Sequence, residues 1–184
     1  MTLTTAKWTV NDYHRMIAAE ILAGRHVELL NGEIVEMAPE GETHAYCSDE
    51  AGEYLIYLLG SRAKVRQAKP ITLPFSSSEP EPDLAIVQRL GRGYREHHPY
   101  PENIFWVVEY SDSSLSKDLE IKTRIYAVAG IPEYWVINLQ KMELIVLRSP
   151  TDEGYQSKEV MTQGVIHPLA FPDIAVSVQR LIAS

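Results

Sequence analysis

Three charged residues stand in this sequence where apolar residues would be expected. Asp83 opens the strand-like run 83–87, Glu109 ends the apolar run 104–109, and Lys122 falls on the apolar face of an expected helix. A buried charge is costly unless it pairs with another charge or with a metal. Two carboxylates and a lysine that converge at strand ends indicate a magnesium-type hydrolytic site, because carboxylate oxygens are ligands that Mg²⁺ prefers.

The position of Lys122 follows from the phase of its helix. Serines that can cap a helix precede the segment 114–129, and Gly130 and Pro132 follow it. At about 100° per residue, Lys122 lies within the apolar half of this helix. That half carries Leu115, Leu119, Ile121, Ile125, Tyr126, Val128 and Ala129, together with Asp118 and Lys122. Alternatively, Lys122 forms an ion pair with Asp118 four residues earlier, or extends to solvent from the rim of the apolar face.

The remaining elements are predicted from periodicity and turn signals. Asn31 and Gly32 favour the type I′ turn of a hairpin over 27–37. We expect helices from about Thr9 to Leu22 and over 44–59, and strands over 64–73, 83–87, 104–109, 133–138 and 144–147. The strand, helix and strand between Ile104 and Ile137 indicate a parallel pair. The expected fold is therefore α/β, with a mixed β-sheet flanked by helices, an N-terminal helix and a β-hairpin.

Length and composition set limits on the class of protein. The 184 residues fit one domain over 1–184, and a hydrophobic content of 45% is ordinary for a globular chain. The single cysteine, Cys47, excludes an internal disulfide and a cysteine-based zinc cluster. The sequence contains no apolar run of membrane-spanning length, and its N-terminus lacks the apolar region of a signal peptide. We therefore expect a cytoplasmic protein that has no membrane contact.

The net charge of −8 argues against a protein that coats nucleic acid, because such proteins neutralise phosphates with excess basic residues. Two basic clusters leave room for a local basic groove. They consist of Arg62, Lys64, Arg66 and Lys69, and of Arg89, Arg92 and Arg95. Alternatively, both clusters are solvated loop charges without a function.

Several motifs together resemble one known family. The motifs are Pro82-Asp83, the segment 108–114, Asp118, Lys122, Tyr126 and the segment 130–135. They are similar to the small bacterial family of restriction endonuclease-like proteins, much of it catalogued as a domain of unknown function, within the PD-(D/E)xK nuclease superfamily. The resemblance extends to the N-terminal helix, the Asn-Gly hairpin and His44, and so covers nearly the whole chain. It implies a restriction endonuclease-like core.

The resemblance also implies roles for individual residues. Asp83, Glu109 and the backbone carbonyl of Tyr110 would hold Mg²⁺ or Mn²⁺. Ser111 stands where the common superfamily motif has its lysine, and Lys122 on the following helix would take over that role. Asp118 would anchor Lys122. The superfamily often adds a glutamate from an N-terminal helix, for which the substitutes here are Glu28, Glu36 and His44.

These residues predict a metal-dependent nuclease that hydrolyses phosphodiester bonds of DNA, with Lys122 orienting the attacking water or stabilising charge on the phosphate. A homodimer is expected, with the apolar tail residues Phe171, Ile174 and Val176 as its contact surface. Two alternatives stay open. The chain could be an inactive nuclease-fold module that binds nucleic acid or a protein partner, or a hydrolase of a small phosphorylated compound. Glu109 and Lys122 could also form only a buried ion pair, with Asp83 as a cap at a strand entry.

Overall fold

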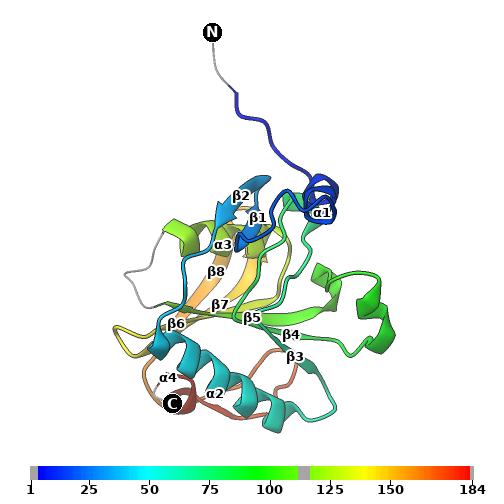
Figure 1. Cartoon of the computed structure of the whole chain (residues 1–184). Helices are drawn as coiled ribbons and strands as arrows, with labels where there is room; N and C mark the ends of the chain where they lie inside the picture. Colours follow the sequence, from blue (N-terminus) through cyan, green and yellow to red (C-terminus); the bar gives the residue numbers. More distant parts are fainter. Residues whose placement is uncertain (1–3, 112–116, 183–184) are drawn as a thin grey trace.

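A six-stranded mixed sheet forms the centre of the fold (Figure 1). The computed structural model describes residues 4–111 and 117–182. In spatial order the strands are β3 (Lys64–Gln67), β4 (Leu84–Val87), β5 (Ile104–Ser111), β6 (Glu133–Asn138), β7 (Glu143–Thr151) and β8 (Gly154–Met161). Strands β5 and β6 are parallel, and the other neighbours are antiparallel. The predicted α/β class, mixed sheet and parallel pair are thus confirmed.

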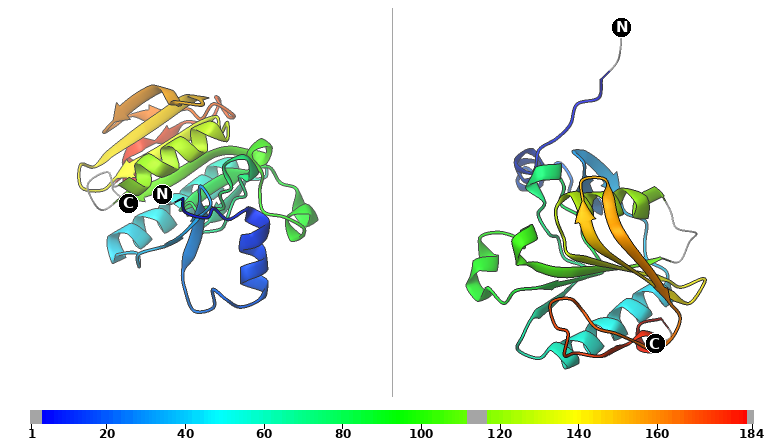
Figure 2. Two further views of the ribbon diagram at one scale, coloured as in Figure 1. Left: turned by 90° about the horizontal axis from the view of Figure 1, so that it is seen from above. Right: turned by 180° about the vertical axis from the view of Figure 1, so that it is seen from behind.

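Helices cover both faces of this sheet, as Figures 1 and 2 show. Helix α2 (Glu42–Leu59) and the short helix α4 (Val178–Ile182) pack on one face. Helix α3 (Lys117–Val128) packs on the other face, together with the hairpin of β1 (Val27–Leu30) and β2 (Glu33–Glu36). Short 3₁₀ turns, η1 (Pro74–Ser76), η2 (Gly91–Arg95) and η3 (Pro101–Asn103), lie in the connections. No helix among the described residues is long and apolar enough to cross a membrane.

The alternation of side chains along the strands decides which residues face α3. Along β5, Trp106 and Val108 belong to the core beneath α2, whereas Val107 belongs to the core beneath α3. Successive side chains of a strand point to opposite faces, so Glu109 projects toward α3. Asp83 precedes Ala85 by two residues, and Ala85 also packs on the α3 side. Both acids therefore belong to one face of the sheet.

The hairpin and two of the three expected helices agree closely with the sequence-based prediction. Asn31 and Gly32 both have positive φ, 49° and 74°, as a type I′ turn requires. Helix α2 keeps Cys47 buried, and Gly130 has a φ of 74° just past α3. The serines predicted to cap α3 lie outside the described residues. Ile121, expected on the buried half of α3, is 41% exposed.

Two predicted elements are shorter than expected, and a residue with positive φ follows each of them. Helix α1 (Val10–Ala18) does not reach Leu22, because Glu20 has a φ of 58°, which an α-helix cannot contain. The strand predicted to reach Leu73 ends at Gln67, because Ala68 has a φ of 44°. Neither residue is a glycine or asparagine, so the sequence gives no signal for these breaks.

The C-terminal tail is part of the core. Strand β9 (Val165–Ile166) pairs with β10 (Val176–Ser177), and α4 follows. Phe171, Ile174 and Val176 are 6%, 8% and 0% exposed and pack with α2. The prediction that these three residues form a dimer contact surface is therefore wrong, because the chain buries them itself.

Candidate functional site

A cleft of about 280 Å³ opens on the α3 side of the sheet. The hairpin, the connection from β2 to α2, the first turn of α2, the adjacent parts of β4 and β5, and α3 all contribute to its walls. The polar residues among those that line it are Glu28, Glu36, Glu40, His44, Asp83, Glu109, Tyr110, Ser111 and Lys122. Segments far apart in the sequence therefore bring most of the predicted site residues together.

Lys122 is buried against Glu109, as the helical phase predicts. Its side chain is 9% exposed, and Nζ donates a hydrogen bond to Glu109 Oε1 at 3.1 Å. Tyr126, one helical turn further along α3, donates its hydroxyl proton to the same oxygen at 2.8 Å. Burial raises the pKa of Glu109 to about 7, although the charge of Lys122 acts in the opposite direction.

Glu28 is a second buried partner of Lys122. Its Oε1 lies 3.3 Å from Nζ, and its Oε2 accepts the backbone N–H of Glu81 at 3.1 Å. Burial lowers the pKa of Lys122, but the charges of Glu109 and Glu28 outweigh this effect and raise it above its ordinary value. Lys122 therefore stays protonated between two buried carboxylates. The side chain of Asp118, its predicted anchor, lies outside the described residues.

His44 links Asp83 to the backbone of β5. Asp83 Oδ2 accepts the N–H of Tyr110 at 2.6 Å, and His44 Nε2 lies 3.2 Å from this oxygen and 3.2 Å from the Tyr110 carbonyl oxygen. Burial lowers the pKa of His44, but the hydrogen bond to Asp83 and the charges of Asp83 and Glu40 raise it to about 9. The imidazole thus contacts two of the oxygen atoms predicted to bind a metal.

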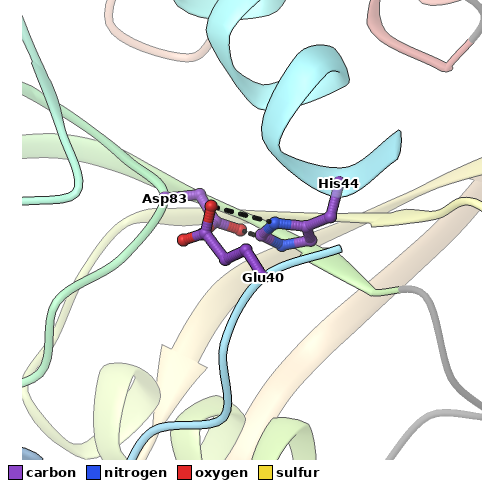
Figure 3. Close-up of side chains that lie close together, drawn as sticks. All are labelled: Glu40, His44 and Asp83. Carbon is purple, nitrogen blue, oxygen red and sulfur yellow. Dashed lines mark ion pairs between the residues drawn. The ribbon is translucent and has the colours of Figure 1, made fainter. Parts of the chain in front are cut away.

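Glu40 completes a group of three potential metal ligands (Figure 3). Its Oε2 lies 3.5 Å from His44 Nδ1, and one ligand atom from each of Glu40, His44 and Asp83 lies within 4.8 Å of the others. Carboxylate oxygens and an imidazole nitrogen are common ligands of divalent metals, so this donor set fits a metal ion. Glu40 was not among the residues predicted from the sequence, because it precedes α2 and its N-cap Gly41, where helical spacing gives no signal. Tyr126 was predicted on the apolar half of the helix and among the family motifs, but not as a partner of Glu109.

The other predicted residues take less central places. Ser111 is buried in the wall of the cleft. Glu36 lines the cleft, but its Oε1 accepts a hydrogen bond from Arg25 Nε at 2.8 Å, and its side chain is 64% exposed. It is thus a poorer substitute ligand than His44 or Glu40. Lys122 is the only lysine or arginine among the described residues that line the cleft.

Neither basic cluster reaches the cleft. Arg89 donates to the carbonyl oxygens of Gly60 and Ala63, just beyond the C-terminal end of α2, and Arg66 packs over the ring of Tyr94. His44 is in the first turn of α2, about 24 Å from Gly60 along the helix axis. Arg89 therefore lies far from the cleft. The first cluster extends closer to Asp83, because Arg66 lies opposite Ala85 across β3 and β4 and Lys69 directly follows Ala68, but none of its residues lines the cleft.

A buried lysine paired with carboxylates beside a potential metal site, on one face of a mixed sheet, agrees with the restriction endonuclease-like core that the sequence resemblance implies. A solved structure with this fold is a crystal structure described as a putative nuclease belonging to DUF820 from Anabaena variabilis ATCC 29413. It has a TM-score of 0.75 at 14% identity, and the match covers 95% of this chain and 97% of that chain. At this identity, the similarity shows the fold.

The family follows from the sequence itself. The model of the Uma2 family, described as "Putative restriction endonuclease", matches residues 10–179, and the chain therefore belongs to this family. No curated protein matches the sequence. The family and the fold support a nuclease-like function, and restriction endonuclease-like families are typically metal-dependent.

Proposed function

We propose that this protein is a metal-dependent nuclease that hydrolyses phosphodiester bonds of DNA in the cleft between α3 and the hairpin. The observation that carries the proposal is the position of Lys122. It is held between Glu109 and Glu28, in the same cleft as Asp83 and His44. A lysine in this position is available to the phosphate of a substrate that contacts Asp83.

The metal would be Mg²⁺ or Mn²⁺, held by Asp83, the carbonyl oxygen of Tyr110 and Glu109. The two side-chain hydrogen bonds that Glu109 accepts from the described residues both involve Oε1, so Oε2 is the oxygen that we assign as the ligand. When bound, such an ion polarises a phosphate and lowers the pKa of bound water. Because His44 Nε2 now contacts both Asp83 Oδ2 and the Tyr110 carbonyl oxygen, a bound metal would either displace the imidazole proton and take Nε2 as a further ligand, or displace the ring itself.

The chain's own residues supply the remaining functions. Lys122 keeps its positive charge because Glu109 and Glu28 raise its pKa, so it can stabilise negative charge that grows on the phosphate or orient the attacking water. Tyr126 and Lys122 together fix the orientation of Glu109. Glu40 lies beside His44, and its charge helps to raise the pKa of the imidazole.

The test is nicking of supercoiled DNA in Mg²⁺ or Mn²⁺, combined with metal titration by calorimetry. Asp83→Asn and Glu109→Gln should each lower nicking by at least about 100-fold and weaken metal binding, because each removes a charged ligand. Lys122→Gln should also lower nicking by about 100-fold but leave metal affinity within a few-fold. The control is Glu53→Gln, an exposed acid of α2 outside the cleft.

Other results would change the proposal. If the wild type binds metal and DNA but does not cut, the chain is a nuclease-fold binding module. If it hydrolyses nucleotides but no polymer, it is a hydrolase of small phosphorylated compounds. A wild type that binds no metal and cuts neither DNA nor RNA would refute the proposal that the protein is an enzyme.

A further inference from the structure

A second cavity, of about 440 Å³, lies on the other side of Asp83. Its volume falls within the range of about 300–1,000 Å³ that is usual for small-molecule sites. It shares Glu40 and Asp83 with the cleft, so a group bound in it adjoins any phosphate held at Asp83. The residues that line it are Glu40, Ala45, Tyr46, Ser48, Asp49, Gln67, Ala68, Asp83 and Leu84.

The charge of this cavity differs from that of the cleft. Three carboxylates line it, those of Glu40, Asp49 and Asp83, and none of the described lining residues is a lysine or arginine. Such a cavity repels phosphate but accepts hydrogen bonds from amino groups. Its occupant is therefore a part of a substrate that carries N–H donors and no negative charge.

Gln67 and Asp49 form a donor and acceptor pair in the wall. Gln67 Nε2 lies 3.4 Å from Asp49 Oδ1 and 3.5 Å from its carbonyl oxygen, both long distances for a hydrogen bond. Gly52 makes room for this amide, because a Cβ atom at position 52 would lie 2.0 Å from Nε2. An amide next to a carboxylate matches the edge of a nucleobase, where an amino group adjoins a ring acceptor.

Tyr46 adds an aromatic surface to the same cavity. It belongs to the first half of α2, between His44 and Asp49, and it is 55% exposed. Exposed aromatic rings beside a strand-binding site commonly stack on bases. Tyr57 is a natural comparison, because it is 82% exposed on the same helix but does not line the cavity.

We infer that this cavity binds the base of the nucleotide next to the phosphate held at Asp83, and that it prefers adenine and cytosine, whose amino group adjoins a ring acceptor on the pairing edge, over thymine. The inference rests on the proposed function, because it takes the phosphate to lie at Asp83. Asp49 would accept from the amino group, the Gln67 amide would donate to the adjoining ring nitrogen, and Tyr46 would stack on the base. Such a base must be unpaired or turned out of the duplex, because its pairing edge is occupied.

The first test measures binding apart from hydrolysis. Fluorescence anisotropy in Ca²⁺ would compare a short labelled oligodeoxyadenylate with the same strand carrying abasic positions, and gel analysis would show that the strands stay intact. The wild type should bind the intact strand about 10-fold more tightly, and Tyr46→Ala should remove most of this ratio. Tyr57→Ala should leave the ratio of the two affinities unchanged. Equal affinity of the wild type for both strands would overturn the inference.

The second test concerns the edge of the base. Asp49→Asn and Gln67→Ala should each reduce the preference for oligodeoxyadenylate over oligodeoxythymidylate by about 5-fold or more, whereas Glu53→Gln should not. Gly52→Ala should have the same effect as Gln67→Ala, because the added methyl group displaces the Gln67 amide while alanine favours the helix. No change of preference in any of these variants would overturn the assignment of the base edge.

These results are separable from those of the nicking assay. A wild type that binds intact strands better than abasic ones, but does not cut, would refute the proposed function and support the role of the cavity as a base-binding site. A wild type that nicks DNA but does not distinguish the two strands would support the proposed function and refute the role of the cavity as a base-binding site.

Discussion

At the scale of residues, buried hydroxyl and carboxylate groups set the local energetics of the site. Tyr126 and Tyr134 are both fully buried, and their rings meet edge to face with centroids 5.0 Å apart. The Tyr126 hydroxyl donates to Glu109, whereas the Tyr134 hydroxyl has no partner among the described residues. The two rings therefore share one environment but differ in one hydrogen bond.

Replacement of each tyrosine by phenylalanine measures how much that hydrogen bond contributes to the free energy of unfolding. Tyr126→Phe should lower the free energy of unfolding by about 1.5–3 kcal/mol, because it removes a hydrogen bond to a charged, buried group. Tyr134→Phe should be neutral or slightly stabilising, because it removes a hydroxyl that is buried without a partner. Urea denaturation of both variants checks the difference. Equal losses would show that packing, and not the bond to Glu109, decides the effect.

At the scale of elements, the end of β3 helps to position Asp83. Ala68 directly follows β3 with a φ of 44°, and its N–H donates to the carbonyl oxygen of Asp83 at 2.9 Å. An L-residue with a side chain is strained in this conformation, and the hydrogen bond holds the backbone where β4 begins. The break that shortens β3 thus also fixes the backbone of a predicted metal ligand.

Ala68→Gly should relieve this strain and raise the free energy of unfolding by up to about 1 kcal/mol, because glycine adopts positive φ without a clash. Ala45→Gly, at an exposed position of α2, should instead lower it by about 1 kcal/mol. Thermal melts of the two variants provide the comparison. A loss of stability in Ala68→Gly would mean that its backbone is not strained.

At the scale of the whole molecule, the charge distribution limits how the protein meets nucleic acid. The net charge is −8, and none of the lysines and arginines of the two basic clusters lines the cleft. Lys122 is the only lysine or arginine among the described residues of the cleft. Substrate recognition therefore depends on few phosphate contacts. A homodimer stays a prediction, and the buried tail does not supply its surface.

The dependence of DNA affinity on salt should accordingly be shallow. Between 50 and 200 mM salt we expect the DNA affinity to fall by no more than about 10-fold. Each neutralised phosphate contributes only about −0.7 to −0.9 to the slope of log affinity against log salt concentration. The double variant Arg92→Ala/Arg95→Ala should keep the same slope. A loss of about 1,000-fold in the wild type, reduced in this variant, would instead show that the second cluster binds the DNA backbone.

The turns, the helix phase and the strand connection of this protein could be predicted from the sequence alone. The Asn31-Gly32 turn, the inward phase of Lys122 and the parallel pair around α3 all depend on short-range rules of turn, helix and crossover geometry. These rules sufficed for the fold class and for the convergence of Asp83, Glu109 and Lys122 in one cleft.

Only the tertiary structure decided which groups meet across the chain. Glu40 approaches Asp83 because α2 begins beside the start of β4, and Gln67 faces Gly52 because β3 ends against α2. The pairing of Lys122 with Glu28, and the burial of Phe171 in the core, likewise join segments that no sequence period relates. Such contacts are set by the packing of whole elements, which the residue pattern within each element does not specify.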